Sequence, residues 1–422
     1  MTALPSYDST VIDPMQVNVG GWDLRKLDLR ERLPDLQRAV FDVRTRWPAV
    51  LPTGFDPARI LELGKNPGLG LRALHAQGVT GRGVSIAIVD QPLLVEHQEY
   101  RDRLRMYEEI HVAAWRAQMH GVATASIAVG KTAGVAPEAD LYFIGCNVTS
   151  DPTFQTPGSD FTGYAQAVNR ILDINKGLPE GRKIRVISLS VGWEPSQTGY
   201  QEITQAVERA RREGVFVISS SLERTHGLRF HGLTREPLAD PDSPASYGRV
   251  QGWGPGAGTP LLFVPMNSRA TAAPTGDGDY AFYPVGGWSW VTPYLAGLYA
   301  LACQAKPDVT PEEFWRVALE TGDPAPAAPP VPVSREEIRK QEAARAEERL
   351  APVRAKLSAD EFRRRVRQIY EHETGKPAPE AMGEKEFQEW LVEMATDLQM
   401  SRYEPPSGRI PNPVRLVAAL QK

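Results

Sequence analysis

The chain has 422 residues, of which 41% are hydrophobic and 8% aromatic, so it holds enough apolar material for a large folded domain with an elaboration. Its 48 basic and 52 acidic residues give a formal net charge of −4, which argues against a nucleic-acid-binding surface and against a polybasic membrane surface. Only two cysteines occur, Cys146 and Cys303, so we expect no disulfide framework.

We expect no secretory signal in this sequence. The first ten residues, MTALPSYDST, have neither a basic segment nor an apolar one, as a secretory signal would. The most apolar stretch, Val291–Ala305, is shorter than the roughly 20 residues that a membrane helix needs, and it contains Pro293. We therefore expect a soluble, cytoplasmic protein that binds neither nucleic acid nor a membrane.

Residues 1–78 are a mixed segment that contains proline, glycine and the tryptophans Trp22 and Trp47 but no chemical motif. We interpret them as an N-terminal extension. Two roles are open for it: a structural segment that wraps the following domain, or a segment that inhibits that domain by reaching its active site.

From Gly83 onward, short strands alternate with helices. Four runs rich in β-branched residues read as buried parallel strands: 84–89, 141–144, 184–189 and 215–218. Between the last two, Ile203, Ala206, Val207 and Ala210 follow a helical period, and Gly214 closes that helix. The alternation predicts an α/β domain with a mostly parallel central sheet covered by helices on both faces.

The composition changes after residue 322. Before it, Thr310 followed by Pro311 and Glu313 is a strong helix start. Residues 323–333 are rich in proline and alanine and read as a linker, and residues 334 to about 400 are charged and helical. Ser358 with Glu361 predicts the start of one helix, and 387–398 shows the apolar spacing of another. This block is either a small structural helical hairpin or a surface for a protein partner.

Three polar residues stand where an α/β sheet collects active groups. Asp90 ends the first predicted strand, His120 opens the helical run HGVATASIAVG, and Ser289 lies where Gly286-Gly287 gives way to an apolar helix. We expect Pro293 to occupy the first turn of that helix. A serine at a helix start has its own backbone N–H free to donate to an oxyanion.

These segments resemble the subtilase (peptidase S8) family of serine peptidases, in their intracellular form. IAIVDQP resembles the family's Asp motif, HGVATAS its His motif, GVAPEADLYFIG its next strand, and GWSWVTPYLAG its Ser motif. The resemblance implies a subtilisin-like three-layer α/β fold over a catalytic domain at 79–322. GRIPNPVRLVAAL resembles the family's closing turn and helix, at 406–422, which makes 323–405 a linker and charged helical insertion within that domain.

The resemblance implies a serine endopeptidase that cleaves polypeptides without a cofactor or a metal. Ser289 would be the nucleophile, His120 the general base and Asp90 the residue that orients the histidine. RVISLSVGW resembles the segment that lines the substrate groove, so Ser190, Val191 and Gly192 would contact substrate. Ser219, Ser220 and Ser221, at the end of a later strand, would border the same groove.

The sequence departs from the family pattern at the oxyanion hole. The family uses an asparagine amide there, whereas this chain has Glu223, or Leu222 in a register shifted by one. Trp288 replaces the threonine before the nucleophile, and Gln91-Pro92 follows the aspartate. Two functions remain open: a working peptidase whose oxyanion hole consists of Ser289 and a protonated Glu223, or a pseudoprotease that keeps the fold for binding or regulation.

Overall fold

A computed structural model describes residues 3–8, 15–112, 116–147, 159–250, 260–326, 334–343, 358–374, 377, 389–390, 392–396 and 407–422. The chain divides into two compact units. The larger unit comprises Met1–Val250, Pro260–Pro326 and Gly408–Lys422, and the smaller comprises Gln251–Thr259 and Ala327–Ser407.

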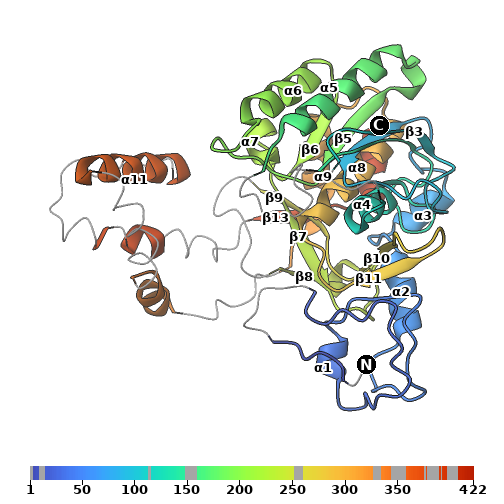
Figure 1. Cartoon of the computed structure of the whole chain (residues 1–422). Coiled ribbons are helices and arrows are strands. Elements are labelled where there is room, and N and C mark those ends of the chain that lie inside the picture. The colour runs from blue at the N-terminus through green and yellow to red at the C-terminus, as the bar shows by residue number, and fades with distance from the viewer. Residues whose placement is uncertain are drawn as a thin grey trace. The chain divides into compact units, whose positions relative to one another are not determined.

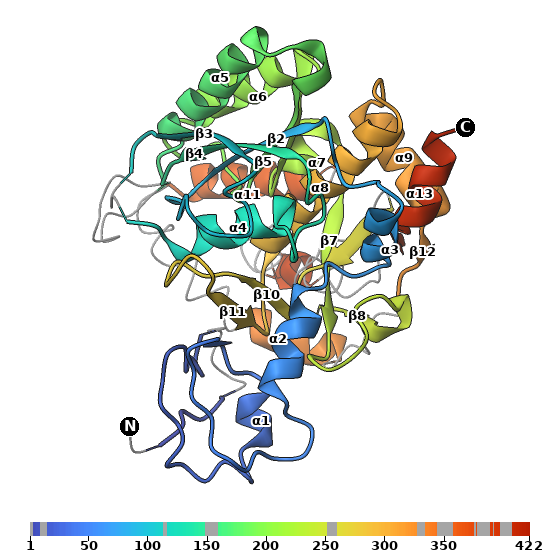
Figure 2. The same ribbon diagram turned by 90° about the vertical axis from the view of Figure 1, so that its right-hand side faces the viewer.

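Figures 1 and 2 label most of the elements. The helices are α1 (Leu33–Leu36), α2 (Pro57–Lys65), α3 (Leu71–Ala76), α4 (Met119–Val129), α5 (Thr162–Gly177), α6 (Tyr200–Arg212), α7 (Leu222–His226), α8 (Trp288–Ala305), α9 (Pro311–Thr321), α11 (Ala359–Thr374) and α13 (Pro413–Leu420). The strands are β1 (Phe41–Asp42), β2 (Ser85–Asp90), β3 (Leu104–Glu109), β4 (Asp140–Gly145), β5 (Ile184–Leu189), β6 (Phe216–Ser219), β7 (Phe230–Arg235), β8 (Tyr247–Arg249), β9 (Leu261–Pro265), β10 (Arg269–Ala272), β11 (Tyr280–Tyr283), β12 (Asp323–Pro324) and β13 (Gly408–Ile410).

A five-stranded parallel sheet with the order β3-β4-β2-β5-β6 lies at the centre of the larger unit. Successive residues of β2 face opposite sides of it: Ile86 and Ile88 belong to one buried cluster, and Ala87 and Val89 to another. The first cluster includes residues of α4 and α8, and the second includes residues of α5 and α6, which lie on the other face (Figures 1 and 2). The predicted three-layer α/β arrangement is confirmed.

The predicted local elements occur where the sequence places them. The four expected strands are β2, β4, β5 and β6, and the expected helix before Gly214 is α6. Gly214 has a φ of 74°, the left-handed conformation that favours glycine after a helix. Thr310 caps α9, because its hydroxyl accepts a hydrogen bond from the Glu313 backbone N–H at 3.1 Å.

The position of Pro293 differs from the prediction. The helix begins at Trp288, so Pro293 lies inside α8 and not in its first turn. Proline has no N–H, so it cannot bond the carbonyl of Ser289 four residues earlier. The Ser190 hydroxyl donates to that carbonyl instead, at 3.1 Å. Because Pro293 leaves the Ser289 carbonyl without a helical donor, Ser190, which follows β5, can bond to it.

Two further sheets were not predicted. One is mixed, with the order β12-β13-β9-β7-β8, and the other is antiparallel, with the order β1-β11-β10. Residues of the turn between β9 and β10 form hydrogen bonds with the loop that precedes α8. Asn267 Oδ1 accepts from the Gly286 N–H at 3.0 Å, and the Ser268 N–H donates to the oxygen of Pro284 at 3.1 Å.

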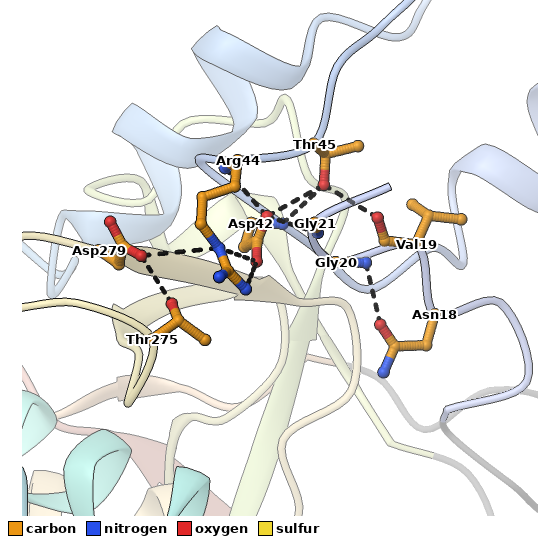
Figure 3. Close-up of polar contacts among 9 residues, drawn as sticks. All are labelled: Asn18, Val19, Gly20, Gly21, Asp42, Arg44, Thr45, Thr275 and Asp279. Atoms are coloured by element: carbon orange, nitrogen blue, oxygen red, sulfur yellow. Dashed lines mark hydrogen bonds and ion pairs between the residues drawn. The ribbon is translucent and has the colours of Figure 1, made fainter. Parts of the chain in front are cut away.

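The N-terminal segment packs against this antiparallel sheet. β1 pairs with β11, and a buried cluster joins residues of the segment to Ala270 and Phe282. In Figure 3 the Asp42 carboxylate accepts the backbone N–H groups of Gly21 and Arg44, at 2.8 and 2.9 Å. The Arg44 guanidinium also approaches Asp279, at 3.6 Å. The segment therefore contributes a strand and part of the core to the larger unit.

The last residues of the chain also belong to the larger unit. β13 runs parallel to β9, and Leu416 and Val417 of α13 join the main buried cluster. Asp323–Pro324, the start of the predicted linker, forms β12 against β13. The rest of that linker, at 327–333, lies outside the described residues.

The smaller unit contains charged helical segments. Residues 335–343 are helical, and the Ser358 hydroxyl accepts from the Glu361 N–H at 3.3 Å before α11, as the capping pattern predicted. Glu393 forms ion pairs with Arg335, at 3.0 Å, and with Arg339. The structure describes the second predicted helix, at 387–398, only at 389–390 and 392–396, and these residues are helical. Among the helices that the structure describes, none is long and apolar enough to span a membrane.

Candidate active site

Asp90 and His120 meet at the carboxyl end of the central sheet. Asp90 is the last residue of β2 and is 2% exposed, and His120 lies in the first turn of α4. His120 Nδ1 lies 2.6 Å from Asp90 Oδ1, the distance of a short charge-assisted hydrogen bond. The backbone N–H of Gln91 donates to the same oxygen at 2.7 Å. The carboxylate therefore fixes the direction of the imidazole and leaves Nε2 as its other reactive nitrogen.

The environment of His120 favours its protonated form. Burial by itself would lower the pKa of the imidazole, but the charge of Asp90 and the hydrogen bond to it outweigh this effect and raise the pKa above its ordinary value of 6.5. The indole of Trp290 packs against the ring, with centroids 5.6 Å apart and planes at 62°. Trp290 is 3% exposed and follows Ser289 directly, so His120 and the start of α8 are close together.

Ser289 lies in the first turn of α8, after Gly287 as N-cap. Gly287 has a φ of 79°, so the sharp entry into the helix requires glycine. The Ser289 hydroxyl donates weakly to the backbone oxygen of Ser190, at 3.5 Å, and no hydrogen bond joins it to His120 in this structure. The structure thus brings Asp90 and His120 into direct contact and ties Ser289 to the end of β5.

The six residues expected to contact substrate form two adjoining segments. Ser190, Val191 and Gly192 follow β5, and Ser219, Ser220 and Ser221 end β6 and lead into α7. The Ser220 N–H donates to the Val191 oxygen at 2.9 Å. A Cβ on Gly192 would lie 3.1 Å from the Ser220 side chain, so glycine allows the close approach of the two segments.

Glu223 lies in the first turn of α7, and its side chain is 59% exposed. Its Oε1 is 3.1 Å from Nε of Arg229, whose own side chain is buried at 4% exposure. A carboxylate oxygen that faces an arginine accepts hydrogen bonds, and an ionised carboxylate donates none. Leu222, the alternative in the shifted register, is fully buried and apolar. Nothing in the local sequence indicated Arg229, because it joins Glu223 only through the fold.

Asp242 and His97, which lie outside the candidate active site, have partners within the fold. The two carboxylate oxygens of Asp242 accept from Asn66 and from the Gly70 N–H, both at 2.9 Å. His97 is fully buried, with Nε2 2.9 Å from the oxygen of Asp279, as a structural histidine would be. Within the part of the chain that the structure describes, no group of three histidine, cysteine, aspartate or glutamate side chains is arranged to hold a metal ion.

Replacing Gly121 by alanine is expected to destabilise the fold by about 3 kcal/mol. A Cβ there would lie 1.9 Å from the backbone oxygen of Gln91, so α4 would have to move away from the end of β2. Denaturant unfolding measures the effect. Gly177→Ala is the control, since a Cβ at the end of α5 meets no atom within 4 Å. An unchanged unfolding midpoint for Gly121→Ala would contradict the close packing at this site.

The comparisons with a family model and with a related protein indicate the same family. The model of the subtilase family matches residues 81–250. A probable subtilase-type serine protease of Deinococcus radiodurans is 28% identical over 305 residues, which cover 59% of this chain and 38% of that protein. The chain therefore spans well under half of that relative. A solved structure of a cold adapted subtilisin-like serine proteinase has 19% identity and a TM-score of 0.44, and the match covers 58% of this chain and 83% of that one.

Proposed function

Because the chain belongs to the subtilase family, we propose that it is a serine endopeptidase that hydrolyses peptide bonds through Asp90, His120 and Ser289. The observation that carries the proposal is the hydrogen bond of 2.6 Å between buried Asp90 and His120. Family membership alone would allow an inactive relative, whereas a buried carboxylate that orients a histidine beside a serine at a helix start is the arrangement that acyl transfer uses.

The reaction would proceed in two halves. Ser289 Oγ attacks the scissile carbonyl while His120 Nε2 accepts the hydroxyl proton, and the resulting imidazolium is stabilised by Asp90. His120 then gives the proton to the leaving amine, which leaves an acyl group on Ser289. Water, activated by His120 in the same way, releases the acyl group. The Ser289 hydroxyl must first turn from Ser190 to His120, a loose resting geometry that is common in enzymes without bound substrate.

The oxyanion hole would be weak at neutral pH. The first donor is the backbone N–H of Ser289, which lies in the first turn of α8 and has no partner within the helix. Glu223 occupies the place of the second donor and can donate only when it is protonated. Its carboxylate faces Arg229 instead. We therefore expect slow turnover.

Substrate would lie along the two segments that follow β5 and β6. Ser190–Gly192 lie beside Ser289, because Ser190 bonds directly to that residue, and Ser220 adjoins Val191. Ser219 and Ser221 are buried, at 0% and 7% exposure, so the substrate would meet mainly Ser190–Gly192 and Ser220. An extended peptide can pair its own backbone with such a segment, which places the scissile carbonyl at the start of α8.

A second function is favoured by one observation. The exposed, ion-paired Glu223 offers no donor where catalysis needs one, as expected of a pseudoprotease that uses the fold for binding or regulation. Such a protein would bind partners without an activated serine. The reactivity of Ser289 therefore separates the two functions.

A fluorophosphonate probe tests the proposal, because it reacts with a serine only when a base activates that serine. We expect labelling of the purified, full-length protein, and peptide mapping should place the adduct on Ser289 and not on the neighbouring Ser190. Heat-denatured protein is the control, and it should not react. Failure of the folded protein to react at any pH from 4 to 8 would contradict the peptidase and support the pseudoprotease.

A further inference from the structure

A second buried polar site, which the proposed reaction does not use, surrounds Arg269. This residue begins β10 and is 2% exposed. Its Nη2 donates to the backbone oxygen of Ala133 at 3.1 Å, and its guanidinium lies 5.7 Å from the ring centre of Tyr294. The Nε and Nη1 atoms of Arg269 are buried without an acceptor among the described residues. The hydroxyl of Tyr294, which is fully buried in α8, is also buried without a partner among them.

Among the described residues, no carboxylate forms an ion pair with Arg269. Tyr294, Tyr247 and Arg235 act on it electrostatically, and Asp242 acts on the two tyrosines. Burial lowers the pKa of this guanidinium, but arginine still keeps its proton in proteins. A buried charge without a partner is strongly unfavourable, so this guanidinium requires a negative charge or several more acceptors.

Arg235 shows how this fold accommodates a buried arginine when it supplies the acceptors itself. Arg235 is 4% exposed, and its two Nη atoms donate to four backbone oxygens at 2.6 to 3.1 Å. One of these oxygens belongs to Ser268, which holds a left-handed φ of 55°. That conformation is unfavourable for serine. The turn that contains Ser268 leads directly into Arg269, whose guanidinium has one hydrogen-bond acceptor among the described residues.

We propose that Arg269 and Tyr294 bind a chloride ion inside the larger unit. Chloride supplies the missing charge and accepts hydrogen bonds from several directions, so it can serve the free N–H groups of Arg269 and the hydroxyl of Tyr294 together. A monatomic ion suits the close-packed interior better than a polyatomic anion does, because every residue named around it is buried. The ion would join β10, which carries Arg269, to α8, which carries Ser289.

Thermal unfolding of the full-length protein at constant ionic strength tests the site. We expect replacement of sodium gluconate by sodium chloride to raise the Tm saturably, by at least about 2 °C, because a ligand that binds only the folded state stabilises it. Arg269→Met should abolish this dependence. Arg316→Met is the matched control, since Arg316 has a side chain that is 58% exposed, and it should retain the full chloride effect.

Crystals of the wild-type protein grown in bromide provide a second test, which needs no variant. We expect an anomalous bromide peak within hydrogen-bond distance of Arg269 Nε or Nη1 and the Tyr294 hydroxyl. A Tm that does not respond to chloride, a site that holds water only, or a chloride effect that persists in Arg269→Met would overturn the proposal. None of these readouts depends on peptidase activity, so the two proposals fail separately.

Discussion

Replacing Asp90 by asparagine is expected to slow fluorophosphonate labelling of Ser289 about 10⁴-fold at neutral pH. The carboxylate accepts the Nδ1 proton of His120 at 2.6 Å, so it holds the tautomer in which Nε2 can act as a base. An asparagine that presents its amide N–H to Nδ1 favours the opposite tautomer, in which Nε2 carries the proton. The buried position, 2% exposed, leaves little water to substitute for the lost charge.

The same substitution should also move the pH dependence. His120 acts as a base only when it is neutral, so the labelling rate rises as the pH increases through its pKa. That pKa is raised by Asp90 against the opposing effect of burial, so the wild-type midpoint should lie above the ordinary value of 6.5. Without the carboxylate, burial alone acts on the imidazole. The residual rate of Asp90→Asn should therefore have its midpoint at lower pH.

The control for Asp90→Asn is Asp140→Asn, the same substitution at the first residue of β4, which pairs with β2. Asp140 begins β4 and pairs with Arg105 at 2.7 Å, so Asp140→Asn alters a strand end and removes a charge without touching His120. We expect the labelling rate of Asp140→Asn to equal that of the wild type. A rate for Asp90→Asn within about tenfold of the wild type would show that this carboxylate does not orient the base.

Replacing Glu223 by asparagine is expected to accelerate labelling and peptide hydrolysis near neutral pH, by about 100-fold to 1,000-fold. An amide supplies the second oxyanion donor that an ionised carboxylate lacks. Arg229, which faces Glu223 Oε1 at 3.1 Å, would lose this ion pair. The gain should appear in kcat more than in KM, because the donor acts on charge that develops only in the transition state.

Glu208→Asn serves as the control for the loss of a negative charge. Glu208 is an exposed residue of α6, and its replacement should leave both rates unchanged. If Glu223→Asn reacted no faster than the wild type while remaining folded, Glu223 would not occupy the place of the oxyanion donor. The oxyanion would then depend on other groups around the start of α8.

The buried central sheet was predictable from the sequence because its strands are local patterns. Runs such as 84–89 are apolar on both sides, and parallel strands covered by helices on both faces require that composition. The helix caps were equally local, since Thr310 and Glu313 are three residues apart. The second and third sheets were missed because their strands are short and pair with distant segments, as β1 does with β11.

The α/β class, the strands of the central sheet and the residue types at Asp90, His120 and Ser289 could be read from the sequence, because each depends on neighbours a few positions away. What these residues touch depends on the tertiary structure. The bond from Ser190 to the Ser289 carbonyl exists because Pro293 leaves that oxygen free within α8. Glu223 meets Arg229, a few residues further along the chain, across the end of α7, and Arg269 meets Ala133 and Tyr294 from distant segments. Such contacts follow from three-dimensional packing, and no local pattern records them.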